Sequence, residues 1–227
     1  MNTKDFQEFL KSLTSGITYV IDKTIPFSDY VVLDLSKKNQ ELESVNLSDP
    51  YEMQSYIIDL LSRKKGKLAF GGYNEQRVLY KDNAQFNGAV KRDIHLGIDL
   101  WITAGTKVLA PLSGIVESFA NNKMIGDYGP TIVLRHEYDE VVFFTLYGHL
   151  STSSLDNLYI GKQFDAGDVI ATLGKPEENV NYAPHLHFQI IRNLEGNIGD
   201  YPGVCSSEDR LFYLNNCPDP NLLLKIN

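Results

Sequence analysis

The sequence predicts a mainly β fold, an antiparallel β-sheet sandwich or open-barrel core with a small α/β extension at the N-terminus. Three observations predict it. From Lys67 onward, short runs rich in Val, Ile, Leu, Phe and Tyr recur. Glycine and proline turn signals separate these runs, and no helical periodicity lies between them. Because parallel strands need long crossover connections, which are usually helices, this spacing favours antiparallel pairing.

The candidate strands of this region have the short lengths that are usual in sheets. They are Lys67–Phe70, Arg77–Tyr80, Ile94–Ile102, Lys107–Ala110, Gly114–Phe119, Thr131–His136, Val141–Tyr147, Asp168–Thr172 and His185–Ile191. No internal repeat interrupts them. We therefore expect residues 67–227 to form one β-rich domain that ends in a C-terminal tail.

The first 66 residues have a different pattern. Residues 3–13 place apolar side chains on one face of a short helix, and Tyr30–Leu35 is typical of a strand. A second helix is expected to begin at Asp49, which precedes a proline, and to end at Gly66. Nothing in this segment clusters as a functional site does. We predict a helix-and-strand extension over residues 1–66 whose role is packing or capping.

Charge and hydrophobicity exclude several classes of partner. The net charge of the 227 residues is −8, and residues 91–227 carry 10 basic and 17 acidic side chains, a net of −7. A surface this acidic repels polyanions, so we expect no nucleic-acid partner. No apolar run approaches the about 20 residues that a membrane-spanning helix needs, so we expect no membrane partner. No pattern predicts the oligomeric state.

The N-terminus and the cysteines bear on location. The first residues, MNTKDFQEFLKSL, contain no apolar h-region, so they do not resemble a secretory signal peptide. We expect a cytoplasmic protein, with the cell envelope as its place only if another route exports it. Cys205 and Cys217 are too few for a disulfide scaffold or a four-cysteine zinc site. We expect reduced, structural thiols.

The chemistry of the chain centres on its five histidines. His185 and His187 flank Leu186 in an apolar candidate strand, and the side-chain period of two places both imidazoles on one face. A lone His-x-His is a weak signal, because buried and hydrogen-bonded histidines are common. It becomes informative only together with further ligands.

His95 and Asp99 form a second pair. In a regular strand, positions i and i+4 lie roughly 13 Å apart, too far for two ligands of one zinc ion. The chain must therefore bend between them or be helical, and Gly97 is where a bend costs least. The flanking apolar residues favour a strand. Two ligands from a kinked strand and a third from His-x-His would leave tetrahedral zinc one open position, which is typical of catalytic sites.

Two histidines remain. His149 follows an apolar strand in Tyr147-Gly148-His149-Leu150, where a strand-capping role is as consistent as a catalytic one. His136 precedes a charged turn, and pairing with a neighbouring acid such as Glu137 explains it fully.

In this order, the three motifs resemble the lysostaphin/LytM-like zinc metallopeptidases, peptidase family M23. That family has His-x-x-x-Asp, then Tyr-x-His-Leu, then His-x-His, and here they are His95…Asp99, Tyr147–Leu150 and His185–His187. The resemblance extends over about residues 88–192. It implies a LytM/lysostaphin-type fold for the β-rich domain.

The resemblance also implies roles. His95, Asp99 and His187 would be the ligands of one Zn²⁺ ion, and His149 and His185 would be catalytic histidines that do not bind the metal. It implies a zinc-dependent metallohydrolase that cleaves peptide bonds, by default a peptidoglycan endopeptidase of the cell wall that uses a zinc-bound water assisted by two histidines. The expected partner is a peptide or a peptidoglycan stem.

Two alternatives stay open. One is a cytosolic zinc amidase or peptidase that acts on a small substrate outside the cell wall. The other is a non-catalytic binding or regulatory module of M23 type. Members of the second kind lack one or more of the five site residues, whereas this chain retains all five.

Departures from the family pattern put the usual substrate in doubt. Asn181–Pro184 replaces a small Ser/Thr-Gly-Pro run, and Gln189 stands where a glutamate is usual. The loop Asn121–Tyr128 is also atypical. Tyr128 and Tyr182 are candidate substrate-binding aromatics, with packing as the alternative for each.

Some relatives are kept latent by an upstream segment that occupies the fourth zinc position. In this chain Tyr73, Asn74 and Glu75 are the candidates for that contact. No spacing rule selects one of them.

Overall fold

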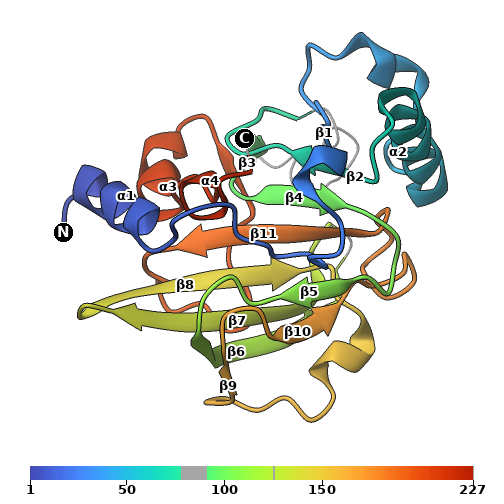
Figure 1. Cartoon of the computed structure of the whole chain (residues 1–227). Helices are drawn as coiled ribbons and strands as arrows, with labels where there is room; N and C mark the ends of the chain where they lie inside the picture. The colour runs from blue at the N-terminus through green and yellow to red at the C-terminus, as the bar shows by residue number, and fades with distance from the viewer. Residues whose placement is uncertain (78–90, 125, 227) are drawn as a thin grey trace.

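A computed structural model describes residues 1–77, 91–124 and 126–226 (Figure 1). Its main feature is an eight-stranded sheet in the order β1-β2-β4-β11-β8-β7-β6-β9. The strands are β1 (Tyr30–Val32), β2 (Leu68–Gly71), β3 (Arg92–His95), β4 (Ile98–Trp101), β5 (Lys107–Leu109), β6 (Gly114–Asn122), β7 (Gly129–Tyr138), β8 (Val141–Gly148), β9 (Gln163–Phe164), β10 (Val169–Thr172), β11 (His185–Ile191) and β12 (Val204–Ser206). The α-helices are α1 (Thr3–Ser12), α2 (Pro50–Lys64), α3 (Arg210–Asn216) and α4 (Asn221–Leu224).

The predicted mainly β class is confirmed, but the sheet is mixed. β1 and β2 run parallel, whereas the other paired strands of the sheet are antiparallel. The reason is α2, which connects β1 to β2 as a helical crossover and so permits the parallel pair. Two separate ladders, β10 with β5 and β12 with β3, complete the strands. Among the described strands the sheet does not close into a barrel.

Most predicted strands form within a residue or two of their expected bounds. The expectation of one strand over Ile94–Ile102 is wrong, because the chain breaks after His95 and resumes as β4 at Ile98. Of Arg77–Tyr80, only Arg77 is described, in an isolated bridge with Ser36, and residues 78–80 lie outside the described residues. The elements that the sequence pattern missed are β9, β12, α3 and α4, which are too short for a reliable periodicity.

The predicted N-terminal elements form, although the strand predicted over Tyr30–Leu35 is only Tyr30–Val32. The Asp49 side chain accepts hydrogen bonds from the first backbone N–H groups of α2, as a helix N-cap does. Lys65 caps the C-terminal end of α2 in the left-handed conformation, and Gly66 N–H donates to Leu61 O. Figure 1 shows α2 beside β1 and β2 at one end of the molecule, with α1, α3 and α4 at the other. The domain boundary at residue 66 stays a prediction.

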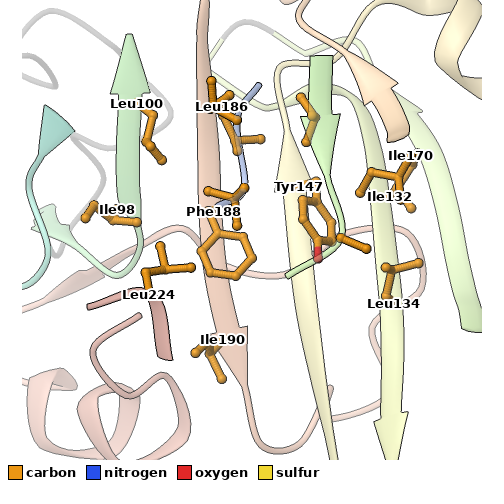
Figure 2. Packing of buried hydrophobic residues seen from close by; sticks show 14 of the residues in the cluster. Ile98, Leu100, Ile132, Leu134, Tyr147, Ile170, Leu186, Phe188, Ile190 and Leu224 are labelled. Carbon is orange, nitrogen blue, oxygen red and sulfur yellow. The ribbon is translucent and has the colours of Figure 1, made fainter. Parts of the chain in front are cut away.

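The alternation of side chains divides the core between the two faces of the sheet. The main hydrophobic cluster includes Leu100, Tyr147, Leu186 and Phe188 from β4, β8 and β11 (Figure 2). Because neighbouring residues on a strand point to opposite faces, His187 lies on the other side of the sheet from this cluster. The candidate site is therefore on the face that the main core leaves open.

Two smaller clusters pack elsewhere. One contains Leu146, Ile191 and Tyr201, and the other joins Met53 of α2 to Trp101 of β4.

None of the helices in the described part of the chain is long and apolar enough to cross a membrane.

Candidate metal centre and active site

Strand register aligns Asp99 and His187 and brings the other predicted site residues close to them. Asp99 of β4 pairs with His187 of β11, and His187 pairs on its other side with Gly148 of β8. His149 follows Gly148 directly, and His95 ends β3, which precedes β4 in the chain and pairs with β12. The sheet therefore gathers residues that are far apart in sequence.

His95, Asp99 and His187 form a buried cluster of potential metal ligands. His187 Nδ1 lies 2.9 Å from His95 Nε2 and 3.0 Å from Asp99 Oδ1, and the last two atoms are 3.3 Å apart. Ligand atoms at 2.0–2.1 Å from a tetrahedral zinc ion are about 3.3 Å from one another. Two imidazoles and one carboxylate are also a ligand set that suits zinc. The residues present therefore fit this ion.

Gly97 makes the cluster possible. The chain turns between β3 and β4 at this position, so the bend predicted between His95 and Asp99 is confirmed. A Cβ atom on Gly97 would lie 2.6 Å from His187 Cε1 and 2.7 Å from Phe188 O. Only glycine lets the turn approach the imidazole this closely.

Hydrogen bonds fix which imidazole nitrogen faces the cluster. His95 Nδ1–H donates to Gly72 O over 2.9 Å, which leaves Nε2 for a metal. His187 Nε2–H donates to Gln189 Oε1 over 2.9 Å, which leaves Nδ1. The Gln189 amide is oriented in turn, because its Nε2 donates to Pro202 O and to Cys217 Sγ. Such partners of ligating histidines set their tautomer and orientation.

A buried arginine contacts the carboxylate of the cluster. Arg77 Nη1 lies 2.5 Å from Asp99 Oδ2, and Arg77 Nε lies 2.9 Å from Glu75 Oε2. Burial by itself would raise the pKa of Asp99, but His95 and Arg77 hold it well below its usual range. Burial, with Arg77 nearby, lowers the pKa of His95 to about 3. The carboxylate is thus ionised and the His95 imidazole neutral, which are the forms that bind metals.

His149 and His185 lie beside the cluster and against each other, with ring centroids 4.1 Å apart. His185 Nδ1–H donates to Ala183 O over 2.7 Å, and His149 Nδ1 faces Asn179 O at 3.4 Å. Each ring therefore keeps Nε2 as its free acceptor. Burial lowers the pKa of both imidazoles, so both are neutral at pH 7.

The two candidate substrate-binding tyrosines flank these histidines. The Tyr182 ring meets the His149 ring edge to face at 5.1 Å and is only partly buried. Tyr128 is 7% exposed, its hydroxyl donates to Tyr201 O, and its ring lies 4.9 Å from that of His187. Both tyrosines line the same pocket as the histidines. A packing role therefore explains Tyr128, which is buried, better than Tyr182, which is only partly buried.

The pocket at the cluster has walls from several parts of the chain. Leu47, Pro50 and Met53 contribute from the N-terminal extension. On another side lie Asp127 and Asp200, two partly buried carboxyls that precede tyrosines. Burial first, and the charge of Asp200 second, raise the pKa of Asp127 to about 6. Through Leu47, Pro50 and Met53, the N-terminal extension thus shapes the pocket as well as capping the fold.

His136 does not belong to this site, and its expected pairing with an acid is wrong. Its Nδ1–H donates to Ser113 O, and its Nε2 lies 2.7 Å from Thr145 Oγ1. Glu137 points to the opposite face of β7 and pairs with Arg135. His136 is a buried structural residue.

The candidates for a latency contact are engaged elsewhere. Tyr73 donates to Cys217 O, Asn74 Oδ1 accepts from Arg210, and Glu75 pairs with Arg77. None of these three side chains reaches the three-residue cluster through a contact of its own.

Cys217 is a free, buried thiol whose pKa burial raises to about 12, so it stays protonated.

The sequence model for peptidase family M23 matches residues 93–197. Residues 93–197 are therefore similar to the M23 peptidases. The predicted resemblance to this family is confirmed, and the matched segment contains all five predicted site residues. An uncharacterized metalloprotease of Haemophilus influenzae is 34% identical over 99 residues, which cover 44% of this chain and 19% of that protein. This chain thus matches about a fifth of the length of that curated relative.

Solved structures similar to the chain include two peptidases. The catalytic domain of the antimicrobial peptidase lysostaphin from Staphylococcus simulans is 28% identical, with a TM-score of 0.40 over 63% of this chain and 90% of that one. A zinc containing peptidase from Vibrio cholerae is 25% identical, with a TM-score of 0.35 over 44% of this chain and 28% of that one.

Sequence reasoning missed Arg77 and the contact made by Gln189. Arg77 gave no signal, because a lone arginine 22 residues before its partner has no spacing rule. Gln189 did give a signal, because it lies two residues after His187 on a predicted strand and therefore on the same face. The matched segment therefore receives a contact to Asp99 from a residue that precedes it.

Proposed function

We propose that this protein is a zinc-dependent peptidase that hydrolyses an amide bond in the pocket beside His187. One observation carries the proposal. The ligand atoms of His95, Asp99 and His187 lie within 3.3 Å of one another, and the same pocket holds the buried histidines His149 and His185. The M23 family match and the metalloprotease relative support the same conclusion.

His95, Asp99 and His187 would hold one Zn²⁺ ion. When bound, such an ion supplies Lewis acidity that lowers the pKa of water and polarises an amide carbonyl. The three protein ligands leave a tetrahedral site incomplete, which distinguishes catalytic from structural zinc sites. The neutral His95 imidazole and the ionised Asp99 carboxylate are already in the forms that bind a metal.

His149 and His185 would perform the proton transfers. Because both residues line the pocket and their Nδ1 atoms face backbone carbonyls, Nε2 of either ring would be the atom that accepts a proton from the attacking water. The protonated imidazole can then donate a hydrogen bond to the developing oxyanion or a proton to the leaving amine. Ala183 O holds His185 in the required tautomer, and Tyr182 limits the movement of the His149 ring.

The first candidate substrate is a peptide of peptidoglycan, either a stem or a cross-link. The resemblance to lysostaphin/LytM-like peptidases supports it. A second candidate is a small amide outside the cell wall that carries an ammonium group. The carboxyls of Asp127 and Asp200 in the pocket wall favour this class, because they would attract a cation next to the scissile bond.

A single set of variants tests the proposed activity. Wild type, His149→Ala and His187→Ala are purified, their zinc content is measured by elemental analysis, and each is incubated with purified wall material. We expect His187→Ala to lose zinc and activity. His149→Ala should keep zinc but lose activity by a factor of about 10²–10⁴, the usual contribution of a general base.

His136→Gln is the matched control, since His136 is an equally buried histidine away from the cluster. It should retain zinc and activity. Equal activity of all variants would reject the proposal, as would a folded wild-type protein that binds no zinc. Mass spectrometry of muropeptides, compared with a panel of small amino-amides, distinguishes the two substrate classes.

A further inference from the structure

Arg77 is the largest fully buried side chain among the described residues, with 1% of its surface exposed. An isolated buried guanidinium would be very costly, so its partners reveal its role. It bridges two carboxylates, with Nη1 2.5 Å from Asp99 Oδ2 and Nε 2.9 Å from Glu75 Oε2. Only one of these, Asp99, belongs to the candidate metal cluster.

The surroundings fix the guanidinium. Gly72 lies against it so closely that a Cβ at that position would overlap the guanidinium group. The far oxygen of Glu75, Oε1, accepts the backbone N–H of Leu35 over 3.1 Å. Glu75 is therefore held by the N-terminal extension while it holds Arg77. Arg77 Cζ also lies over the Trp101 ring, 5.6 Å from its centroid.

This arrangement assigns different tasks to the two oxygens of Asp99. Oδ2 is bound to Arg77, whereas Oδ1 faces His187 Nδ1 at 3.0 Å and His95 Nε2 at 3.3 Å. A carboxylate without such a partner can rotate and offer both oxygens to a cation. The second oxygen would then compete for the position that water or substrate needs.

We propose that Arg77 is a positioning residue that holds Asp99 for binding of a divalent metal through one oxygen, with Glu75 fixing Arg77 from the N-terminal extension. The inference rests on the proposed zinc site. It adds that residues outside the matched family segment, at positions 35, 75 and 77, determine the affinity and coordination of the metal. Partners of metal ligands commonly contribute 10–100-fold to metal affinity.

The test uses the full chain with Arg77→Lys and, separately, Glu75→Gln. Lysine keeps the buried charge but cannot bridge two carboxylates as the guanidinium fork does. Arg135→Lys is the control for the substitution itself, because Arg135 forms a more exposed ion pair of 2.7 Å with Glu137 away from the site. Two quantities are measured on protein that retains its near-UV circular dichroism: the zinc dissociation constant by chelator competition, and the visible absorption of the cobalt-substituted form.

We expect Arg77→Lys to weaken zinc binding at least tenfold and Glu75→Gln to weaken it by a smaller factor. The cobalt bands of Arg77→Lys should lose intensity as the coordination number rises. Arg135→Lys should match wild type in both. Folded Arg77→Lys and Glu75→Gln proteins with zinc affinity within threefold of wild type and an unchanged cobalt spectrum would overturn the inference. That result leaves the proposed function intact, whereas a wild type that binds neither metal would reject the function itself.

Discussion

Gln189 Oε1 lies 2.9 Å from His187 Nε2, two positions further along the same strand. The amide is locked in this orientation, because its nitrogen already donates to Pro202 O and Cys217 Sγ. The imidazole must therefore carry its proton on Nε2 and present Nδ1 to Asp99 and His95. A neutral amide at this position controls the tautomer of a metal ligand without adding a charge to the buried cluster.

Replacing Gln189 by leucine should weaken zinc binding by about tenfold or more, because His187 loses the acceptor that fixes its tautomer. The zinc dissociation constant, measured by chelator competition, is the readout. Gln163→Leu, an exposed glutamine on β9, serves as the control and should leave the constant unchanged. Equal affinity of folded Gln189→Leu and wild type would show that the contact does not prepare the ligand.

Gly97→Ala should abolish tight zinc binding. The new methyl group would lie 2.6 Å from His187 Cε1, so either the imidazole or the turn between β3 and β4 must move. Zinc content after dialysis and the thermal midpoint of the apo-protein measure the effect. Gly16→Ala is the matched control, since nothing lies within 4 Å of the added atom. Retention of one zinc per chain by Gly97→Ala would contradict the packing argument.

Local patterns predicted the parts of the site that lie close together in sequence. The period of a strand placed His185 and His187 on one face, and the distance between His95 and Asp99 required the bend at Gly97. These inferences need only the geometry of a single strand. They could not show that Asp99 and His187 are paired neighbours, since β4 and β11 are more than eighty residues apart.

What the patterns missed depends on such long-range pairing. β1 joins β2 in parallel because α2 carries the chain across, and this joins the extension to the edge of the main sheet. Arg77 reaches Asp99 only because the chain after β2 runs back along β3. Neither fact has a signal in spacing or composition, because each depends on how distant segments meet.

Asp127→Asn should stabilise the protein at pH 7.5. In the folded protein the pKa of Asp127 is raised to about 6, mainly by burial and further by Asp200. Between its ordinary value of 3.8 and about 6, the folded state holds a proton that the unfolded state has lost. Stability therefore falls as the pH rises through this window, and the loss persists above it.

Asparagine does not ionise and can still accept the Tyr128 N–H. Because the carboxyl is only partly buried, we expect a gain of about 1 kcal/mol, or roughly 2–4 °C in thermal midpoint. At pH 4 the variant and wild type should unfold at nearly the same temperature. Asp165→Asn, at an exposed carboxylate, should change neither value. If Asp127→Asn gained no more stability over wild type at pH 7.5 than it does at pH 4, the dependence of stability on the Asp127 pKa would be contradicted.

Removal of residues 1–66 should destabilise the protein rather than activate it. The deletion removes β1 from the sheet and takes Phe6 from its edge-to-face contact with Phe143. It also removes α2, including Met53, from the hydrophobic cluster that contains Trp101. Each fully buried side chain of this kind contributes about 1.5–3 kcal/mol, so the sum rivals the whole stability of a domain.

Near-UV circular dichroism, thermal unfolding and peptidase activity are compared for the truncated and full chains. We expect loss of cooperative unfolding together with loss of activity. Met53→Ala is a milder variant, which should remain folded but lose about 2–5 kcal/mol of stability. A truncated protein that unfolds cooperatively at the wild-type temperature and cleaves substrate faster would instead establish that the extension inhibits the site, through the pocket wall formed by Leu47, Pro50 and Met53.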